Sequence, residues 1–515
     1  MSSYILSHDL GTTGDKAVLF SSSGKLVANQ FSSYPTYYPH LGWAEQDPNH
    51  YWQAFCNSTK TLLEKTKTKR ADIACVSFSG QMMAALPVDR KGKALRNSII
   101  WADLRSTKQA EKFSRRIEAD RIYNLTGHRL SASYSAAKIM WLQDNEPDIY
   151  KNTFKFIHAK DYLAAQLTGR LVTDYSDASG MNLLDINKLE WSEEILAATA
   201  IDRDKLPDIV ESIEVIGKVS AGAARQSGLL EGTPVVIGGG DGACATCGSG
   251  VVHEGEAYIY LGTSTWMATA STRPLIDPQQ RTFTFCHFTR GLYFPTGTMQ
   301  SGGGSFQWLK NTLCNSERAA AEQAGIDVYD LLNLKAKEVP CGSEGVIFLP
   351  YLMGERSPLW NPDARACFVG LSMVHDKRHM IRAVLEGVAY NMKLIEEAFL
   401  EQGVNISTIR MIGGGAKSRL WRSIFSDITE RKVARLNFIE EATSIGAAIA
   451  GGVGVGIFSS LKETDKLVKL EEEIHPNEDN FPIYRRYYNI FKTTYEKLFD
   501  VFSMMAETRD KEEEI

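Results

Sequence analysis

The sequence predicts an α/β protein built from two large domains. Its 515 residues are about three times the ~150 residues that are typical of one domain. Short apolar segments of strand type alternate with long segments of helical periodicity, such as residues 381–395, and this alternation indicates an α/β fold. The third observation is a strand, turn and strand pattern that occurs once in each half of the chain.

In the first half, apolar residues 4–10 and 14–20 flank the turn Gly11-Thr12-Thr13-Gly14. In the second half, residues 257–261 lead through Gly262-Thr263-Ser264-Thr265 into the apolar segment 266–270. Because a strand and not a helix follows each turn, neither is a Rossmann fingerprint or a Walker phosphate loop. One such turn alone is by default a tight hairpin. Two of them favour duplicated domains, 1–250 and 251–515, with a phosphate site in the cleft between them.

A third glycine-rich segment, Gly413 to Ser418, follows the apolar residues 410–412 and precedes a helical stripe of Leu420, Ile424 and Ile428. We expect a loop that opens a helix, whose free N–H groups can hold a ligand. The glycine spacing of a Walker loop is absent. Lys417 therefore fits a solvated lysine and a residue at the edge of an adenine equally well.

Two acids stand in similar positions. Asp9 and Asp241 each follow an apolar strand and lie within glycine-bordered turns. Either one alone is more often structural, but the parallel settings favour a pair of roles. One acid would serve a metal, and the other would accept a proton from an attacking hydroxyl group. Cys244 and Cys247 form a Cys-x-x-Cys pair without a second pair to complete a metal site, so we interpret them as packing residues.

The composition excludes several classes of partner. The chain has 57 Lys and Arg against 62 Asp and Glu, a net charge of −5, so no bulk positive field attracts nucleic acid or anionic lipid. No run approaches the ~18 consecutive apolar residues of a membrane span. The eight cysteines show no disulfide spacing and the N-terminus no signal pattern. We expect a cytoplasmic protein without nucleic-acid or membrane partners.

Two further segments contain polar side chains beside apolar ones. Gln81, Met82 and Met83 follow an apolar segment, and Trp101 precedes Asp103 and Arg105. Amide, carboxylate and guanidinium groups near an aromatic ring suit a polyol, which offers hydroxyl edges and a C–H face. Taken alone, they are explained better by a surface ion pair and a core tryptophan.

Together these residues resemble the FGGY carbohydrate kinases, over nearly the whole chain. The motifs that carry the resemblance are Asp9-Leu10-Gly11-Thr12-Thr13, Gly42-Trp43-Ala44-Glu45-Gln46-Asp47-Pro48, Ser79-Gly80-Gln81-Met82, Trp101-Ala102-Asp103-Leu104-Arg105, Gly239-Gly240-Asp241-Gly242, Leu261-Gly262-Thr263-Ser264, Gly302-Gly303-Gly304-Ser305-Phe306-Gln307-Trp308-Leu309, Gly354-Glu355-Arg356-Ser357-Pro358 and Ile412-Gly413-Gly414-Gly415-Ala416.

The resemblance implies two ribonuclease-H-like domains of the actin and hexokinase ATPase type, which close around ATP, Mg²⁺ and a sugar. It implies that Asp241 is the catalytic base and that Asp9 is a catalytic acid near the phosphates, which holds the metal through water. The positions that resemble nucleotide contacts of the family are Gly11, Thr12, Thr13, Gly262, Thr263, Gly303, Gly414 and Gly415.

Within the family, Ser79-Gly80-Gln81-Met82 is most like the xylulose kinases, but Met83-Ala84 replaces the usual His and Gly. The segments around Trp101 and Arg356 also resemble gluconate kinases. The candidate substrate residues are Gln81, Met82, Met83, Trp101, Asp103 and Arg105, with Arg105 the partner for a substrate carboxylate.

The expected function is ATP-dependent phosphorylation of a terminal hydroxyl group of a small sugar, a ketopentose first and a sugar acid second. The alternative from another class is a non-catalytic, nucleotide-gated regulatory protein on the same fold. The identity of the sugar and a homodimer stay open.

Overall fold

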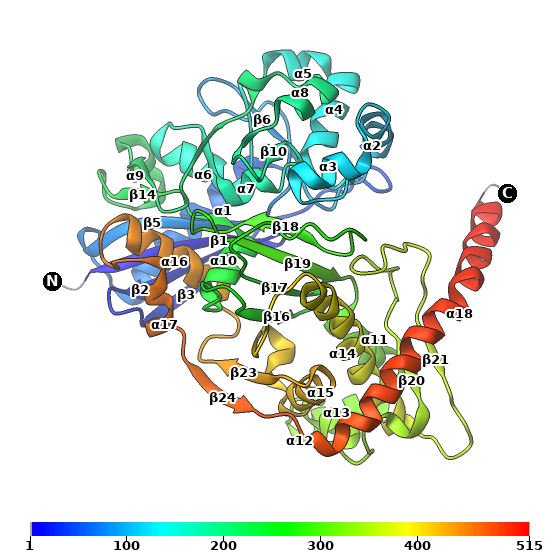
Figure 1. The fold of residues 1–515 in the computed structure, drawn as a ribbon. Coiled ribbons are helices and arrows are strands. Elements are labelled where there is room, and N and C mark those ends of the chain that lie inside the picture. The colour runs from blue at the N-terminus through cyan, green and yellow to red at the C-terminus, as the bar shows by residue number, and fades with distance from the viewer. Residues whose placement is uncertain (1–2, 514–515) are drawn as a thin grey trace.

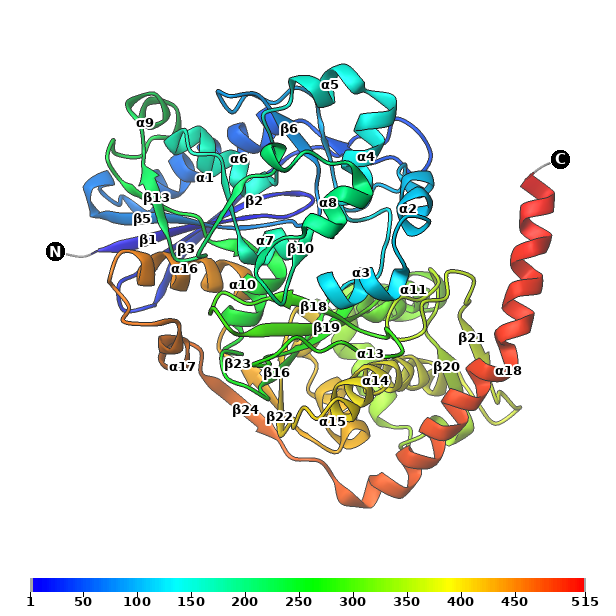
Figure 2. The same ribbon diagram turned by 45° about the horizontal axis from the view of Figure 1, so that its top comes forward.

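The computed structural model describes residues 3–513, which form two α/β halves, each built on a seven-stranded sheet (Figure 1). The first sheet lies in the half that holds the N-terminus, and the second lies in the half that ends in the long helix α18 (Figure 2). Among the described residues, no helix has the length and apolar character that a membrane crossing requires.

The first sheet has the strand order β13-β14-β5-β1-β2-β3, with β15 pairing with β5. Strands β1, β2 and β3 are antiparallel neighbours, whereas β5 and β14 run parallel to β1. The bounds are β1 Tyr4–Leu10, β2 Gly14–Ser21, β3 Leu26–Ser33, β5 Ile73–Gly80, β13 Val215–Lys218, β14 Pro234–Val236 and β15 Gly239–Gly240.

The second sheet repeats this plan. Its order is β18-β19-β17-β16-β22-β23-β24, with an antiparallel hairpin of β16 and β17, two parallel strands β22 and β23, and an antiparallel edge strand β24. The bounds are β16 Ala257–Leu261, β17 Thr265–Thr269, β18 Phe283–Cys286, β19 Tyr293–Met299, β22 Thr408–Ile412, β23 Lys432–Leu436 and β24 Leu470–Ile474. Both predicted hairpins are present, and the duplicated α/β architecture is confirmed.

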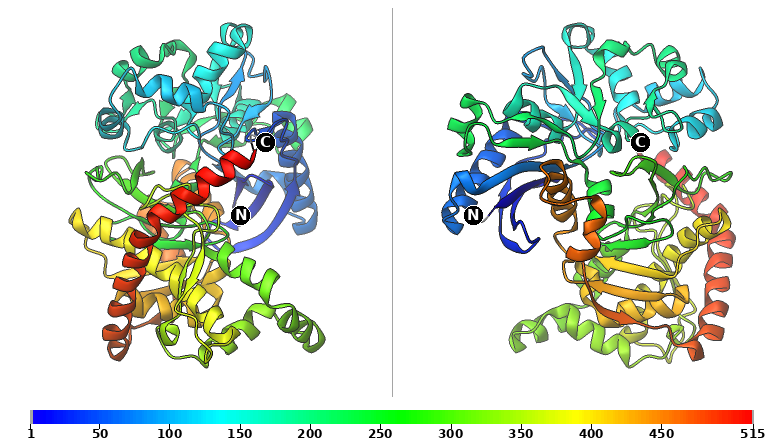
Figure 3. Two further views of the ribbon diagram at one scale, coloured as in Figure 1. Left: turned by 90° about the vertical axis from the view of Figure 1, so that its right-hand side faces the viewer. Right: turned by 60° about the vertical axis from the view of Figure 1, so that its left-hand side comes forward.

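Helices cover both sheets, and a layer of helices and short strands extends the first half away from the second (Figure 3). The helices are α1 Pro48–Thr66, α2 Thr107–Ser114, α3 Ala119–Thr126, α4 Ser135–Asn145, α5 Pro147–Asn152, α6 Ala159–Thr168, α7 Tyr175–Ser179, α8 Glu193–Thr199, α9 Ala221–Ser227, α10 Asp241–Gly248, α11 Gly302–Leu313, α12 Asn315–Ala324, α13 Val328–Lys337, α14 Lys377–Glu401, α15 Arg419–Thr429, α16 Ala442–Gly454, α17 Thr464–Leu467 and α18 Phe481–Glu513. The remaining strands are β4 Glu45–Gln46, β6 Leu86–Val88, β7 Ser98–Ile99, β8 Lys155–Ile157, β9 Val172–Asp174, β10 Leu184–Asp185, β11 Glu190–Trp191, β12 Asp208–Val210, β20 Ile347–Leu349 and β21 Cys367–Val369.

The two halves meet where α10 crosses α16, as Figures 1 and 2 show. A Cβ atom on Gly248 of α10 would lie 1.8 Å from the carbonyl oxygen of Ala442, and one on Gly446 of α16 would lie 2.0 Å from that of Cys244. Only glycine permits this approach of the two backbones. Cys244 and Cys247 are buried and free in α10, in agreement with their interpretation as packing residues.

Candidate active site

Asp9 and Asp241 lie at corresponding places on the first sheet. Asp9 is near the end of β1, and Asp241 is the first residue of α10, directly after β15. Both β1 and β15 run parallel beside β5, where Asp9 is opposite Ser79 and Gly240 is opposite Gly80. The pairing therefore brings the carboxyl ends of β1 and β15 to the same edge of the sheet.

The surroundings of the two acids raise the pKa of each above its ordinary value. Burial raises the pKa of Asp9, and a 2.6 Å hydrogen bond from Thr443 opposes that rise. Burial also raises the pKa of Asp241 to about 7, and the negative charge of Asp9 adds to the shift. A carboxylate with a pKa near neutrality can accept a proton from a substrate hydroxyl group, which is the requirement for a general base.

A cavity of about 610 Å³ lies in the second half, at the ends of β16 and β22. Its size is within the range of small-molecule sites. The predicted nucleotide residues that line it are Gly262, Thr263, Gly303, Gly414 and Gly415. The structure therefore brings together five residues from three segments that are far apart in the sequence.

The turn Gly262-Thr263 is bound to the first turn of α11. The N–H groups of Gly303 and Gly304 donate to the carbonyl oxygens of Gly262 and Thr263, at 2.8 and 2.9 Å. A Cβ atom on Gly303 would lie 2.3 Å from the carbonyl oxygen of Gly262. Glycine at this position therefore allows the turn to lie directly on the first turn of α11.

The turn of the first half is linked to the predicted sugar residues. The indole N–H of Trp101 donates to Oγ1 of Thr12 at 3.0 Å, and the amide of Gln46 donates to the carbonyl oxygen of Thr12 at 2.7 Å. The amide of Gln81 donates in turn to Oε1 of Gln46 at 2.7 Å. Trp101 is 42% exposed, whereas Gln81 is buried and its Oε1 has no hydrogen-bond partner among the described residues. Gln81, Trp101 and Thr12 therefore belong to one hydrogen-bonded unit.

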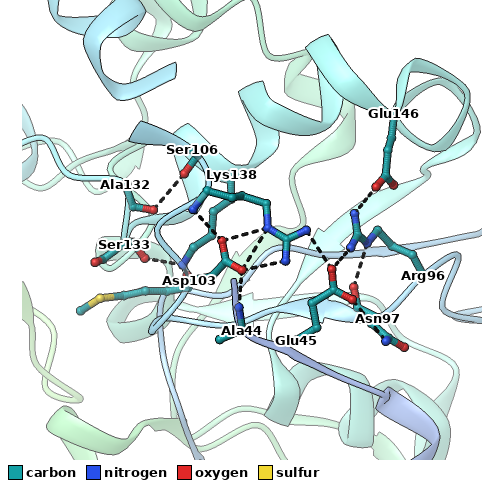
Figure 4. Close-up of polar contacts among 12 residues, drawn as sticks. Ala44, Glu45, Arg96, Asn97, Asp103, Ser106, Ala132, Ser133, Lys138 and Glu146 are labelled. Carbon is teal, nitrogen blue, oxygen red and sulfur yellow. Dashed lines mark hydrogen bonds and ion pairs between the residues drawn. The ribbon is translucent and has the colours of Figure 1, made fainter. Parts of the chain in front are cut away.

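Asp103 and Arg105 form a buried ion pair, and Figure 4 shows Asp103 beside Ala44 and Glu45. The guanidinium group of Arg105 also pairs with Glu45 at 2.8 Å and lies 3.6 Å from the ring centre of Trp43, and its side chain is 0% exposed. Asp103 accepts from the backbone N–H of Ala44 at 2.5 Å. In the structure, this pair holds the segment around residue 44 in place. The predicted contact of Arg105 with a substrate carboxylate stays a prediction.

The predicted residues Met82 and Met83 are held from two sides. The Met82 side chain is buried against the strand end that carries Asp241. Met83 has a backbone φ of 65°, which is unusual for a residue with a side chain. The ammonium group of Lys138 donates to the carbonyl oxygens of Met83 and Ser133, at 2.8 and 2.5 Å. Burial lowers the pKa of Lys138 to about 7.

Comparison with known proteins identifies the family. The models of the FGGY family of carbohydrate kinases match residues 4–248 with the N-terminal domain and residues 257–455 with the C-terminal domain. The chain belongs to this family. It is therefore a carbohydrate kinase, an enzyme that uses ATP to phosphorylate a small-molecule sugar, and its fold is the two-domain fold expected from the sequence.

Relatives of this FGGY kinase differ in their named substrates. The gluconokinase of Bacillus subtilis is 35% identical over 508 residues, which cover 98% of each chain. The xylulose kinase of the same organism is 30% identical over 507 residues, which cover 98% of this chain and 99% of that one. The crystal structure of gluconate kinase from Lactobacillus acidophilus superposes with a TM-score of 0.91 at 28% identity, over 98% of this chain and 100% of that one.

Several residues of the site could not be predicted from the sequence. Gln46 lies within a quoted motif but received no role, because nothing in the motif shows that its amide joins Thr12 to Gln81. Lys138 and Thr443 carried no signal, since each acts through one contact with a residue distant in the chain. The side chains that line the cavity and were not predicted to do so include Tyr260, Phe306, Gln307, Asp327, Tyr329, Asp330, Asn333, Ser418 and Trp421. Several of them lie on α11 and α13, whose periodicity by itself indicates only helices.

Proposed function

We propose that this kinase transfers the γ-phosphoryl group of ATP to a terminal hydroxyl group of a sugar acid of the gluconate class, and that Asp241 is the catalytic base. The observation that carries the proposal is the position of Asp241, a carboxyl group with a pKa of about 7 that shares one edge of the sheet with Asp9. The retention of both acids argues against a non-catalytic regulatory protein, which has no need of a base.

In the proposed reaction, Asp241 removes the proton of the substrate hydroxyl group as its oxygen bonds to the γ-phosphorus, and the bond to the bridging oxygen of ADP breaks. Gly262, Thr263, Gly303, Gly414 and Gly415 bind the nucleotide in the cavity of the second half. The turn Gly11 to Thr13 faces the phosphates from the first half. Alignment contributes most of the rate in such a transfer, because the loose transition state needs little covalent help from the protein.

Asp9 is the residue that would hold Mg²⁺, through water. A carboxylate suits this hard cation, and the hydrogen bond from Thr443 to Oδ2 of Asp9 leaves lone pairs of the carboxylate that could accept from a water of the metal. When bound, Mg²⁺ neutralises charge on the phosphates. Thr443 fixes the orientation of the carboxylate for this purpose.

The preference for a sugar acid rests on two observations. The gluconokinase relative is 35% identical and the xylulose kinase relative 30%, and Met83-Ala84 departs from the sugar loop of xylulose kinases. A ketopentose is the second candidate, favoured by Ser79-Gly80-Gln81-Met82.

Arg356, rather than the predicted Arg105, would supply a cation for a substrate carboxylate, because the guanidinium group of Arg105 is already held in buried ion pairs. The guanidinium carbon of Arg356 lies 5.7 Å from the ring centre of Phe283, whose ring centre lies 5.9 Å from that of His128 in the first half. Burial lowers the pKa of His128, and the charge of Arg356 adds to that shift. Among the residues that the structure describes, no carboxylate forms an ion pair with Arg356. The adjacent Glu355 does not neutralise it, because burial raises the pKa of Glu355 to about 8.

The test is ADP formation from ATP and Mg²⁺ with gluconate, both enantiomers of xylulose and ribulose, and glycerol as acceptors. We expect gluconate to give the highest kcat/KM and Asp241→Asn to abolish turnover while it leaves ATP binding intact. Turnover retained in Asp241→Asn would contradict the role of the base. A higher kcat/KM for one ketopentose than for gluconate would make that ketopentose the acceptor in place of the sugar acid. ATP binding without turnover on any acceptor of the panel would favour the regulatory alternative.

We also propose that the enzyme acts in the cytoplasm, where its eight cysteines, all free in the structure, would stay reduced.

A further inference from the structure

A cluster of buried charged residues lies directly behind the strand ends that carry the site. Lys160 of α6 places its ammonium nitrogen 2.6 Å from Asp161, 3.0 Å from Asp174 and 3.0 Å from Asp177. All four side chains are 0% exposed. Burial disfavours the charge of Lys160, but the three carboxylates raise its pKa well above the ordinary value. The cluster is therefore a salt-bridge centre with a permanent positive charge at its middle.

The same cluster contains a group with the composition of a metal site. The ligand atoms of His158, Asp161 and Asp177 lie within 4.8 Å of one another. However, the ammonium group of Lys160 already contacts two of these three residues. A metal ion would have to compete with a fixed cation, so the arrangement favours a structural role of the cluster within the fold.

Hydrogen bonds connect the cluster to Asp241. Asp174, which pairs with Lys160 through Oδ1, accepts a hydrogen bond from the hydroxyl group of Ser176 at Oδ2, at 2.5 Å. The oxygen of that hydroxyl group accepts from the backbone N–H of Gly240 at 2.9 Å. Gly240 is the N-cap residue of α10 and directly precedes Asp241. Three consecutive contacts therefore join Lys160 to the residue next to the proposed base.

The cluster also supports the neighbouring strand. Gly240 pairs with Gly80 of β5, and the Cβ atom of Lys160 lies 3.0 Å from the place where a Cβ atom on Gly80 would stand. Gln81 follows Gly80 directly. The ends of β5 and β15 thus both lie next to the buried cluster around Lys160.

We propose that Ser176, oriented by Asp174 and Lys160, is a positioning residue for Asp241. This inference rests on the proposed function of Asp241 as the base. The Ser176 hydroxyl oxygen is the partner of the Gly240 N–H, so it fixes the backbone from which the Asp241 side chain projects. A small displacement of a base costs a large factor in rate, because proton transfer requires hydrogen-bond distance.

The chain offers a matched control. Ser212 is also buried, and its hydroxyl group donates to the same oxygen of Asp174 at 2.8 Å. Ser176→Ala and Ser212→Ala each remove one buried hydroxyl donor from Asp174, but only Ser176→Ala leaves the N–H of Gly240 without its partner. A loss that comes only from weakening the cluster would appear in both variants.

The experiment measures kcat, both KM values and Tm for the two variants and for Asp241→Asn, on the acceptor that the wild-type enzyme prefers. We expect Ser176→Ala to lower kcat by about tenfold or more, with both KM values within about twofold of wild type. We expect Ser212→Ala to keep its kcat at a similar Tm. Equal kcat in the two alanine variants would overturn the inference, as would a kcat loss in Ser176→Ala that its loss of folded protein fully explains.

Two arms keep the result interpretable. If Ser176→Ala does not fold, Ser176→Cys replaces it, since a thiol of similar size is a weak acceptor and should give the same loss of kcat. If Asp241→Asn retains turnover, the proposed base is wrong, whatever Ser176 does. If Asp241→Asn is inactive and Ser176 behaves like Ser212, only the positioning role is wrong.

Discussion

The hydroxyl group of Thr443 donates a 2.6 Å hydrogen bond to Oδ2 of Asp9, across a separation of 434 residues in the chain. Thr443 is the second residue of α16, a helix that follows β23 of the second sheet and packs on α10 of the first half. The acid at the end of β1 is therefore held by a helix that lies between β23 and β24 of the second sheet in the chain.

We predict that Thr443→Val lowers kcat. Valine keeps the shape but removes the donor, and a hydrogen bond to a charged group contributes about 1.5–3 kcal/mol, or roughly tenfold or more in rate. Ser444→Ala is the control, because the Ser444 hydroxyl group is buried on the same helix and has no hydrogen-bond partner among the described residues. The measurement is kcat of both variants by steady-state kinetics. An equal loss of kcat in Thr443→Val and Ser444→Ala would contradict the role of Thr443.

The pH dependence of kcat/KM should reflect the ionisation of the Asp241 carboxyl group. Because its pKa is about 7, the carboxyl group is protonated below that pH and cannot accept a proton there. We expect kcat/KM, which reflects the free enzyme, to fall tenfold per pH unit well below pH 7 and to level off above it. A profile that stays flat down to pH 5 would show that the base titrates elsewhere or that another residue acts.

Two glycines of the cavity should differ in their effects. In the part of the chain that the structure describes, no atom lies within 4 Å of a Cβ added to Gly414. Gly414→Ala should therefore keep Tm but raise the ATP dissociation constant about tenfold, because the methyl group takes ligand space. Gly303→Ala should lower both Tm and ATP affinity, since its Cβ would meet the carbonyl oxygen of Gly262 at 2.3 Å. Calorimetric titration and thermal unfolding measure both. Unchanged ATP affinity in both variants would place the nucleotide elsewhere.

Lys138→Met should weaken sugar binding and spare ATP binding. It leaves the carbonyl oxygens of Met83 and Ser133 without their donor, which frees the loop that carries the predicted sugar residues. We expect the KM of the sugar to rise about tenfold and that of ATP to stay the same. Lys112→Met, at a 44% exposed lysine paired with Asp144, should change neither. An equal rise of both KM values would indicate general loss of structure.

Arg356→Gln tests the acceptor. If the guanidinium group binds the carboxylate of a sugar acid, kcat/KM for gluconate should fall about a hundredfold, whereas the value for an uncharged ketopentose should change by less than about threefold. The ratio of the two values is the measurement, and it is insensitive to the amount of active protein. A parallel loss on both acceptors would assign Arg356 to the structure of the domain boundary.

Much of the fold follows from local sequence. The two hairpins are predicted by the apolar strands 4–10 and 257–261 and their Gly-Thr turns. Helical periodicity in 381–395 predicts α14. The contacts of the site's side chains do not follow from local sequence. Arg105 lies two residues from Asp103, which suggests a pair, but Glu45, Trp43 and the burial of the whole group cannot be seen from spacing.

The sequence by itself determined the duplicated α/β plan, the two acids at strand ends and the glycine turns, because each depends on residues that are adjacent in the chain. Only the tertiary structure decided which atoms meet: Thr443 with Asp9, Lys138 with Met83, and Ser176 with Gly240. These contacts join segments from 55 to 434 residues apart. Sheet pairing and helix crossing set their geometry, and no local pattern encodes the direction of a buried side chain.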